Sequence, residues 1–137
     1  MADLATRLAD VVGAEHVLDG DAAGDDYAHD EALTATPQAP ALVVRPVTTA
    51  EVAAVLGLAN DERVPVTARG SATGLSGAAI PRPGGLVVSF ERMHDILEID
   101  LENYVAVVQP GVTLEQLDET LASYGLSFIQ RQVSELI

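Results

Sequence analysis

The chain has 137 residues, a length that suits one domain with a buried core. Its seven basic residues, all arginine, stand against 21 acidic residues, and the net charge of −14 disfavours binding to nucleic-acid phosphates. The absence of cysteine and lysine excludes disulfides, cysteine-based metal sites, a P-loop lysine and a Schiff-base lysine. With no membrane-spanning apolar run and no basic leader, we expect a cytoplasmic protein without a transmembrane segment.

The first third of the chain predicts a helix and then an acidic loop. A helix capped by Asp3 and ended by Gly13 is indicated by apolar residues at helical spacing, Leu4, Leu8, Val11 and Val12. Residues 19–31 are rich in aspartate and are expected to be a loop, followed by an irregular, proline-bracketed stretch up to residue 40.

The next segment predicts a β-helix-β unit. Residues 41–45 form a short apolar run that Pro46 ends, and residues 64–67 form the next one. Between them, Thr48 and Glu51 have the spacing of a capping box. The apolar face expected on that helix comprises Val52, Val55, Leu56 and Ala59. Such spacing is typical of a right-handed crossover between two parallel strands.

The last third predicts three strands and one helix. We expect strands at 86–90, 96–99 and 104–108, the last two joined as a hairpin. Thr113 and Gln116 form a second capping box, and Gly125 suits the C′ position behind the helix. The predicted fold class is therefore α/β (α+β), a small mixed sheet with packed helices.

One loop combines several features of an anion site. Residues 63–90 contain three arginines and no Asp or Glu, in a chain that is otherwise strongly acidic. At the centre of this window lies Arg69-Gly70-Ser71-Ala72-Thr73-Gly74-Leu75-Ser76-Gly77. Glycines let a backbone approach a ligand closely, and successive N–H groups in such a loop form a concave nest for phosphate. The glycine spacing matches neither the Walker A nor the Rossmann pattern, so an ordinary Gly/Ser surface loop remains an alternative.

Residues 65–78 resemble the pyrophosphate loop of FAD-linked oxidases, whose flavin domain is of the p-cresol methylhydroxylase and vanillyl-alcohol oxidase type. Matching elements flank this loop on both sides: Tyr27-Ala28-His29-Asp30-Glu31, residues 43–52, residues 85–93 and residues 107–113. The resemblance spans about residues 20–127. Within the family, it points to the glycolate oxidase D subunit and D-lactate dehydrogenases.

The resemblance implies FAD as cofactor and a set of residues to bind it. The pyrophosphate would be held by backbone N–H groups of Arg69, Gly70, Ser71, Ala72 and Thr73, together with Gly74, Gly77 and Ala78. Pro110 and Gly111 would lie near the adenosine half. Ala72 stands where the family often has glycine, and a positive φ there would cost about 1 kcal/mol. Thr73 occupies the position at which some relatives carry a flavin-linked histidine, so the FAD is expected to be non-covalent.

The family pattern also implies a limit on what this chain does alone. We expect four segments: an N-terminal helix (1–18), an acidic loop and lead-in (19–40), a partial FAD-binding domain (41–127) and a divergent or truncated tail (128–137). The flavin wall and the substrate domain would lie beyond residue 137, so no residue receives a catalytic role. We expect the FAD-binding portion of a 2-hydroxy acid oxidoreductase. The alternative is a truncated, non-catalytic remnant or binding module, with self-association through the truncated face. A small 2-hydroxy acid would be a partner only with the rest of the domain present.

Metal binding is a weaker interpretation of the acidic loop. Residues 19–25 mimic the start of an EF-hand, but Ala23 replaces a ligand and Asp30 stands where the loop needs glutamate. His16, His29 and His94 show no metal-ligand spacing. The sequence therefore predicts no metal site.

Overall fold

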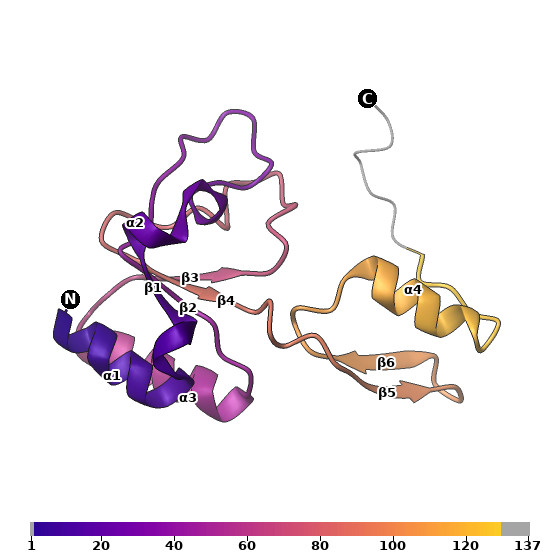
Figure 1. The fold of residues 1–137 in the computed structure, drawn as a ribbon. Coiled ribbons are helices and arrows are strands. Elements are labelled where there is room, and N and C mark those ends of the chain that lie inside the picture. The colour runs from indigo at the N-terminus through magenta and orange to yellow at the C-terminus, as the bar shows by residue number, and fades with distance from the viewer. Residues whose placement is uncertain (1, 130–137) are drawn as a thin grey trace. The chain divides into compact units, whose positions relative to one another are not determined.

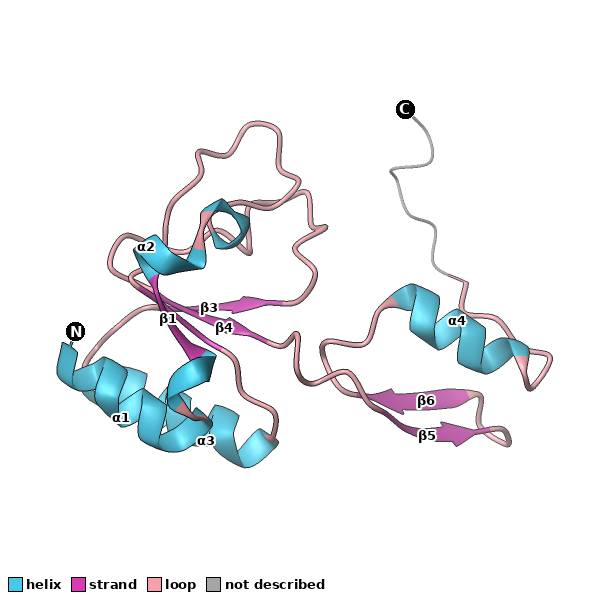
Figure 2. Cartoon of the chain, in the orientation of Figure 1, coloured by secondary structure: helices cyan, strands magenta, loops and turns pink. Residues whose placement is uncertain are grey.

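The structure, a computed structural model, describes residues 2–129, and the chain divides into two compact units, Met1–Met93 and His94–Ile137 (Figures 1 and 2). The first unit contains the helices α1 (Ala2–Val12), α2 (Gly20–Ala23) and α3 (Thr49–Asp61), and the 3-10 turns η1 (Ala14–His16) and η2 (Asp25–Tyr27). Its strands are β1 (Val17–Asp19), β2 (Leu42–Val44), β3 (Val66–Arg69) and β4 (Leu86–Ser89). The second unit contains the strands β5 (Ile96–Asp100) and β6 (Val105–Val108) and the helix α4 (Leu114–Ala122).

The sheet of the first unit has the order β1-β2-β4-β3. β4 is parallel to both β2 and β3, and β1 is antiparallel to β2. This mixed pairing confirms the predicted fold class. The crossover from β2 through α3 to β3 joins parallel strands, as expected, but they are not neighbours because β4 lies between them. Leu86 and its successors are buried on both faces of the sheet, which suits a central position in a parallel arrangement.

Alternation along the strands assigns the two faces of this sheet. Even-numbered residues of β2 and β4 join α1 and α3 in the core: Leu42, Val44, Leu86 and Val88 with Leu4, Leu8, Val12, Val55 and Ala59. The opposite face carries Val43, Val87 and Ser89, which are equally buried. Figure 2 shows α1 and α3 on one side of the sheet, and α2 with the long loops on the other. Residues 20–40 and 70–85 therefore cover the second face.

Several helix boundaries differ from the sequence-based predictions. Asp3 does not cap α1, because that helix begins at Ala2 and Asp3 lies in its first turn. The expected loop at 19–31 contains the end of β1, α2 and η2, and the Asp19 side chain caps α2 by accepting a hydrogen bond from Asp21 N–H. On α3 only Val55 and Ala59 of the expected face are buried, and Leu56 is half exposed. The spacing of apolar residues predicted the helix correctly, but it predicted more buried residues on α3 than the structure has.

The caps and turns followed the predicted chemistry more closely. Thr48 accepts a hydrogen bond from Glu51 N–H, although the Glu51 carboxylate bonds to Val47 N–H instead of completing the box. Thr113 and Gln116 form a complete capping box on α4. Gly125 has a φ of 71°, and Leu126 N–H donates to the Leu121 carbonyl behind it. This is the Schellman arrangement expected of a C′ glycine.

The second unit is an antiparallel hairpin with one helix beside it. β5 and β6 pair from Ile96–Val108 to Asp100–Val105, as the sequence predicted, with an irregularity between Ile96 and Glu98. Leu117 and Leu121 of α4 are buried. No helix among residues 2–129 is both long and apolar enough to cross a bilayer.

Candidate functional site

The predicted anion loop begins where β3 ends. β3 and β4 run in parallel, and Arg69 is paired with Ser89 at their carboxyl ends. The loop leaves from that edge at Gly70 and passes over the face of the sheet opposite α1 and α3 (Figure 1). Ligands of open parallel sheets bind outside the carboxyl ends of the strands. The fold therefore places the loop at the edge where such a site is expected.

The backbone of this loop has unused hydrogen-bond donors. None of the N–H groups from Gly70 to Ala78 donates a hydrogen bond to another described residue. Most of these residues are exposed. Their hydroxyl neighbours Ser71 and Thr73 lie 3.3 Å apart, oxygen to oxygen. A run of free amides in an exposed, irregular loop is the arrangement that binds phosphate oxygens.

Two residues of the loop adopt the left-handed conformation. Ala72 has a φ of 59° and Gly77 a φ of 75°. The positive φ considered above for Ala72 is therefore present, and a side chain there costs about 1 kcal/mol. Strain of this kind persists when the surroundings hold the backbone in place. The contacts around the loop explain how it is held.

The Arg69 guanidinium is directed at the chain itself. It donates one hydrogen bond to the His29 carbonyl at 2.7 Å and another to the Asp26 carbonyl, and it lies over the Tyr27 ring, 5.4 Å from the centroid. With its donors on carbonyls and its face on an aromatic ring, Arg69 ties the end of β3 to segment 26–29. The structure thus gives Arg69 a loop-shaping position.

Asp30 forms a second connection between this segment and the loop. It is one of two buried polar side chains among the described residues, with 8% of its surface exposed. One carboxylate oxygen accepts Ala32 N–H at 3.0 Å, and the other lies 3.4 Å from Ala79 N. In addition, Glu31 N–H donates to the Gly74 carbonyl at 3.0 Å. Segment 30–32 is therefore bonded to both the middle and the end of the loop.

A cluster of polar side chains around Glu91 holds Tyr27 in place. The Glu91 carboxylate accepts hydrogen bonds from Tyr27 at 2.8 Å, Ser89 at 3.0 Å and Arg45 at 3.2 Å. Burial raises the pKa of Glu91, but these hydrogen bonds and the Arg45 charge outweigh it and hold the pKa below the ordinary 4.5. Burial and the Glu91 carboxylate raise the pKa of Tyr27, which keeps its proton. The cluster fixes the ring on which Arg69 rests.

The three arginines of the acid-free window do not gather at the loop, contrary to what the window analysis indicated. Arg63 follows α3, and Arg82 precedes β4, so both lie toward the amino ends of the parallel strands. Only Arg69 lies at the carboxyl end, where it is already engaged. The arginines of this window therefore form no cationic cluster at the loop, and what the loop offers to an anion is its backbone N–H groups.

Pro110 and Gly111 belong to the second unit, which is described by itself. They follow β6, in a turn closed by Val112 N–H donating to the Gln109 carbonyl at 3.1 Å. Gln109 also exchanges hydrogen bonds with Asp95 through its backbone and its side chain. This turn is well fixed locally, and its predicted role near adenosine stays a prediction.

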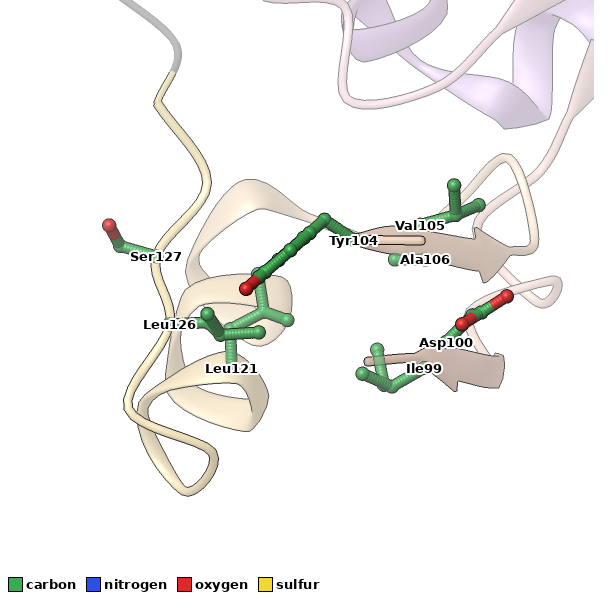
Figure 3. Close-up of a pocket in the computed structure, with 8 residues that line it drawn as sticks. All are labelled: Ile99, Asp100, Tyr104, Val105, Ala106, Leu121, Leu126 and Ser127. Carbon is green, nitrogen blue, oxygen red and sulfur yellow. The ribbon is translucent and has the colours of Figure 1, made fainter. Parts of the chain in front are cut away.

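The second unit also contains a small cavity (Figure 3). Its volume is about 80 Å³, and its lining is mainly apolar: Ile99, Asp100, Tyr104, Val105, Ala106, Leu121, Leu126 and Ser127. Cofactor pockets measure roughly 300–1,000 Å³. The cavity is a packing gap between hairpin and helix and is too small for a dinucleotide.

Tyr27, Asp30 and Glu91 were not among the residues that sequence reasoning assigned to the site. The signal for them was present in the family pattern, where residues 27–31 and 85–93 flank the loop. The pattern could not show that segment 27–31 contacts the loop and that Glu91 holds Tyr27, because these contacts join residues 40 to 64 positions apart.

Comparison with known proteins identifies the family. Residues 40–131, more than half of the chain, match the model described as an FAD binding domain. The chain belongs to this family, and FAD is the cofactor of its members.

Several curated relatives of the chain are named as FAD-linked enzymes or hydroxy-acid oxidoreductases. The chain is 52% identical over 128 residues to an uncharacterized FAD-linked oxidoreductase of Mycobacterium tuberculosis, covering 93% of this chain and 28% of that one. It is 40% identical to the glycolate oxidase subunit GlcD of Bacillus subtilis (92% and 27%). Identity to the D-lactate dehydrogenase of Anaerostipes hadrus is 38% (85% and 25%). The chain thus spans about a quarter of the length of these relatives.

Solved structures agree on the fold. p-Cresol methylhydroxylase superposes with a TM-score of 0.80 at 23% identity, over 91% of this chain and 25% of its own. 4-Ethylphenol oxidase from Gulosibacter chungangensis gives 0.80 at 26% identity, over 90% and 24%. The expected p-cresol methylhydroxylase type of flavin domain is therefore confirmed.

Proposed function

We propose that the loop Gly70–Ala78 binds the FAD pyrophosphate in an oxidoreductase that acts on 2-hydroxy acids. One observation carries the proposal: the backbone N–H groups from Gly70 to Ala78 are bonded to no described residue, in a loop most of whose residues are exposed. A diphosphate offers several acceptor oxygens to such a run of donors, and it needs no lysine. The candidate contacts are Arg69 through Thr73, with Gly74, Gly77 and Ala78, and Pro110 and Gly111 on the adenosine side.

The proposed cofactor is held without a covalent bond. The loop contains no histidine or cysteine, and Thr73 offers only a hydroxyl. Bound FAD supplies a hydride acceptor, and the part of this chain is to bind and orient the diphosphate. The class of substrate rests on the relatives called glycolate oxidase subunit GlcD and D-lactate dehydrogenase.

A titration tests the binding site directly. ADP carries the diphosphate and lacks the flavin, so adding it to the 15N-labelled chain should shift the amide signals of Gly70–Gly74 first. Amides of residues 20–24, in the same unit but away from the loop, serve as the internal control. Shifts confined to residues 19–31 would contradict the proposal.

A second experiment separates binding from turnover. The 137-residue chain is mixed with FAD and desalted, and its visible spectrum is recorded. Partial diphosphate contacts predict micromolar or weaker retention, on the order of half the usual binding energy. We expect no bleaching by glycolate or D-lactate. A stoichiometric yellow protein that D-lactate bleaches would show that these residues suffice for catalysis. Acid precipitation should release any bound flavin into the supernatant.

A further inference from the structure

Asp30 is a buried carboxylate, with 8% of its surface exposed. Carboxylates are rarely buried unless hydrogen-bonded, and this one lies beside a loop proposed to bind a diphosphate. A negative charge there opposes an anionic ligand, so on electrostatic grounds it is a disadvantage. Its presence therefore needs an explanation from geometry.

The hydrogen bonds of the Asp30 carboxylate explain why it is buried beside the loop. Its two oxygens accept from two different backbone donors, Ala32 N–H at 3.0 Å and Ala79 N–H at 3.4 Å. An aspartate can accept on both oxygens, whereas an asparagine has one acceptor oxygen and one NH₂ group that would face an N–H. Only the carboxylate can join segment 30–32 to the end of the loop in this way.

Further contacts make the same connection along the loop. Glu31 N–H bonds to the Gly74 carbonyl, and a Cβ built on Gly77 would lie 3.4 Å from Ala35 Cβ. Arg69 bonds to the carbonyls of Asp26 and His29 at the other end of the loop. Segment 26–35 therefore contacts the loop at its beginning, middle and end.

We propose that Asp30 is a positioning residue: it uses the N–H of Ala79 to hold the far end of the loop, so that the free amides of Gly70–Ala78 converge on a diphosphate. This rests on the function proposed above. The amides can bind an anion well only if they are already oriented, because ordering a flexible loop at the moment of binding reduces affinity. The benefit of orientation then exceeds the cost of a nearby negative charge.

Two opposite expectations distinguish this role from a purely electrostatic one. If the Asp30 charge merely repels the ligand, Asp30→Asn strengthens ADP binding. If Asp30 positions the loop, Asp30→Asn weakens ADP binding about tenfold, although a negative charge has been removed. Asp30→Glu keeps the charge and displaces the oxygens, and it should also weaken binding.

Asp19 provides a matched control. Its carboxylate accepts from the N–H two residues ahead, Asp21 at 3.1 Å, as Asp30 does from Ala32, but no bond joins it to the loop. Asp19→Asn removes the same charge from the same acidic segment. It should leave ADP affinity within about twofold, with any loss of stability appearing only in urea unfolding.

The experiment uses the whole 137-residue chain, with ADP as the probe, and records amide exchange and chemical shifts of residues 70–79 before ADP is added. We expect Asp30→Asn to speed exchange at Ala79 and to shift Gly74–Ala79 in the free protein, whereas Asp19→Asn does not. Unchanged shifts and exchange at these residues, or tighter ADP binding by Asp30→Asn, would overturn the positioning role. If the unsubstituted chain shows no ADP shifts in the loop, the proposed function fails, while the shifts of the free variants still decide the role of Asp30.

Discussion

The central strands of the first unit and the hairpin of the second have similar sequences and opposite environments. β4 reads Leu-Val-Val-Ser and β6 reads Val-Ala-Val-Val, yet every residue of β2 and β4 is buried and none of β5 or β6 is. Apolar composition made both segments strands. Burial depends on what covers the two faces, and among the described residues only the first sheet is covered on both.

The largest effect should come from truncating the covered sheet. Leu86 is fully buried, so Leu86→Ala leaves a cavity and should lower the free energy of unfolding by about 3 kcal/mol. Leu97 of β5 is 61% exposed, and Leu97→Ala should change it by less than about 0.5 kcal/mol. Urea unfolding of both variants measures the difference. Equal losses of stability in the two variants would contradict the difference in burial between β4 and β5.

The N-cap hydrogen bonds should contribute about equally to the stability of the two units, whereas core packing should not. Thr48 and Thr113 each accept a hydrogen bond from the N–H three residues ahead, at 3.1 and 3.2 Å. Replacing either with alanine should cost about 1 kcal/mol. Far-UV circular dichroism during urea unfolding reports both. A negligible loss for Thr113→Ala would mean that α4 contributes little to the stability of its unit.

A smaller effect, of opposite sign, is expected at Ala72. Its φ of 59° is strained for alanine, and glycine relieves the strain at some cost in chain entropy. Ala72→Gly should therefore raise stability by about 0.5 kcal/mol. Ala78→Gly, in the same loop without a positive φ, should lower it slightly. Thermal melts of the pair test this, and a loss in both would show that Ala72 is not strained.

The smallest effect concerns the pH dependence of the cluster around Glu91. Because its folded pKa is lowered, Glu91 adds stability above its ordinary pKa of 4.5 and loses that contribution as the pH falls through the folded value. Its side chain is 42% exposed, so solvent screening keeps the effect small. Glu91→Gln should flatten the loss of stability between neutral and acid pH. An unchanged slope in Glu91→Gln would contradict this role of the carboxylate.

Local chemistry explains which parts of the fold could be predicted from the sequence. Both threonine caps, the hairpin and the C′ glycine depend on residues a few positions apart, and all of them were found. The insertion of β4 between β2 and β3 depends on tertiary pairing, to which neighbouring residues give no clue. The prediction of which α3 residues are buried was partly wrong for the same reason, because strands distant in sequence decide which side of the helix is covered.

The candidate site divides along the same line. A short window of sequence was enough to pick out the glycine-rich loop and to mark Ala72 as a position where glycine is common in the family. The contacts that hold the loop in place, from Tyr27, Asp30 and Glu91, join segments 40 or more residues apart. The charge window rested on three arginines, but two of them, Arg63 and Arg82, lie toward the amino ends of the strands and away from the loop.

The strand order has a consequence for the order of events during synthesis. β2 and β3 do not pair with each other. Both pair with β4, which is synthesised after them. Until Leu86–Ser89 emerge, the nascent chain can assemble α1 and α3 on β1 and β2, but β3 must wait unpaired. Residues 70–85 connect β3 to β4, so their two ends come together only when these strands pair. Closing such a connection is the kind of non-local event that slows folding. The loop proposed to bind the diphosphate is therefore among the last parts of the first unit to be fixed.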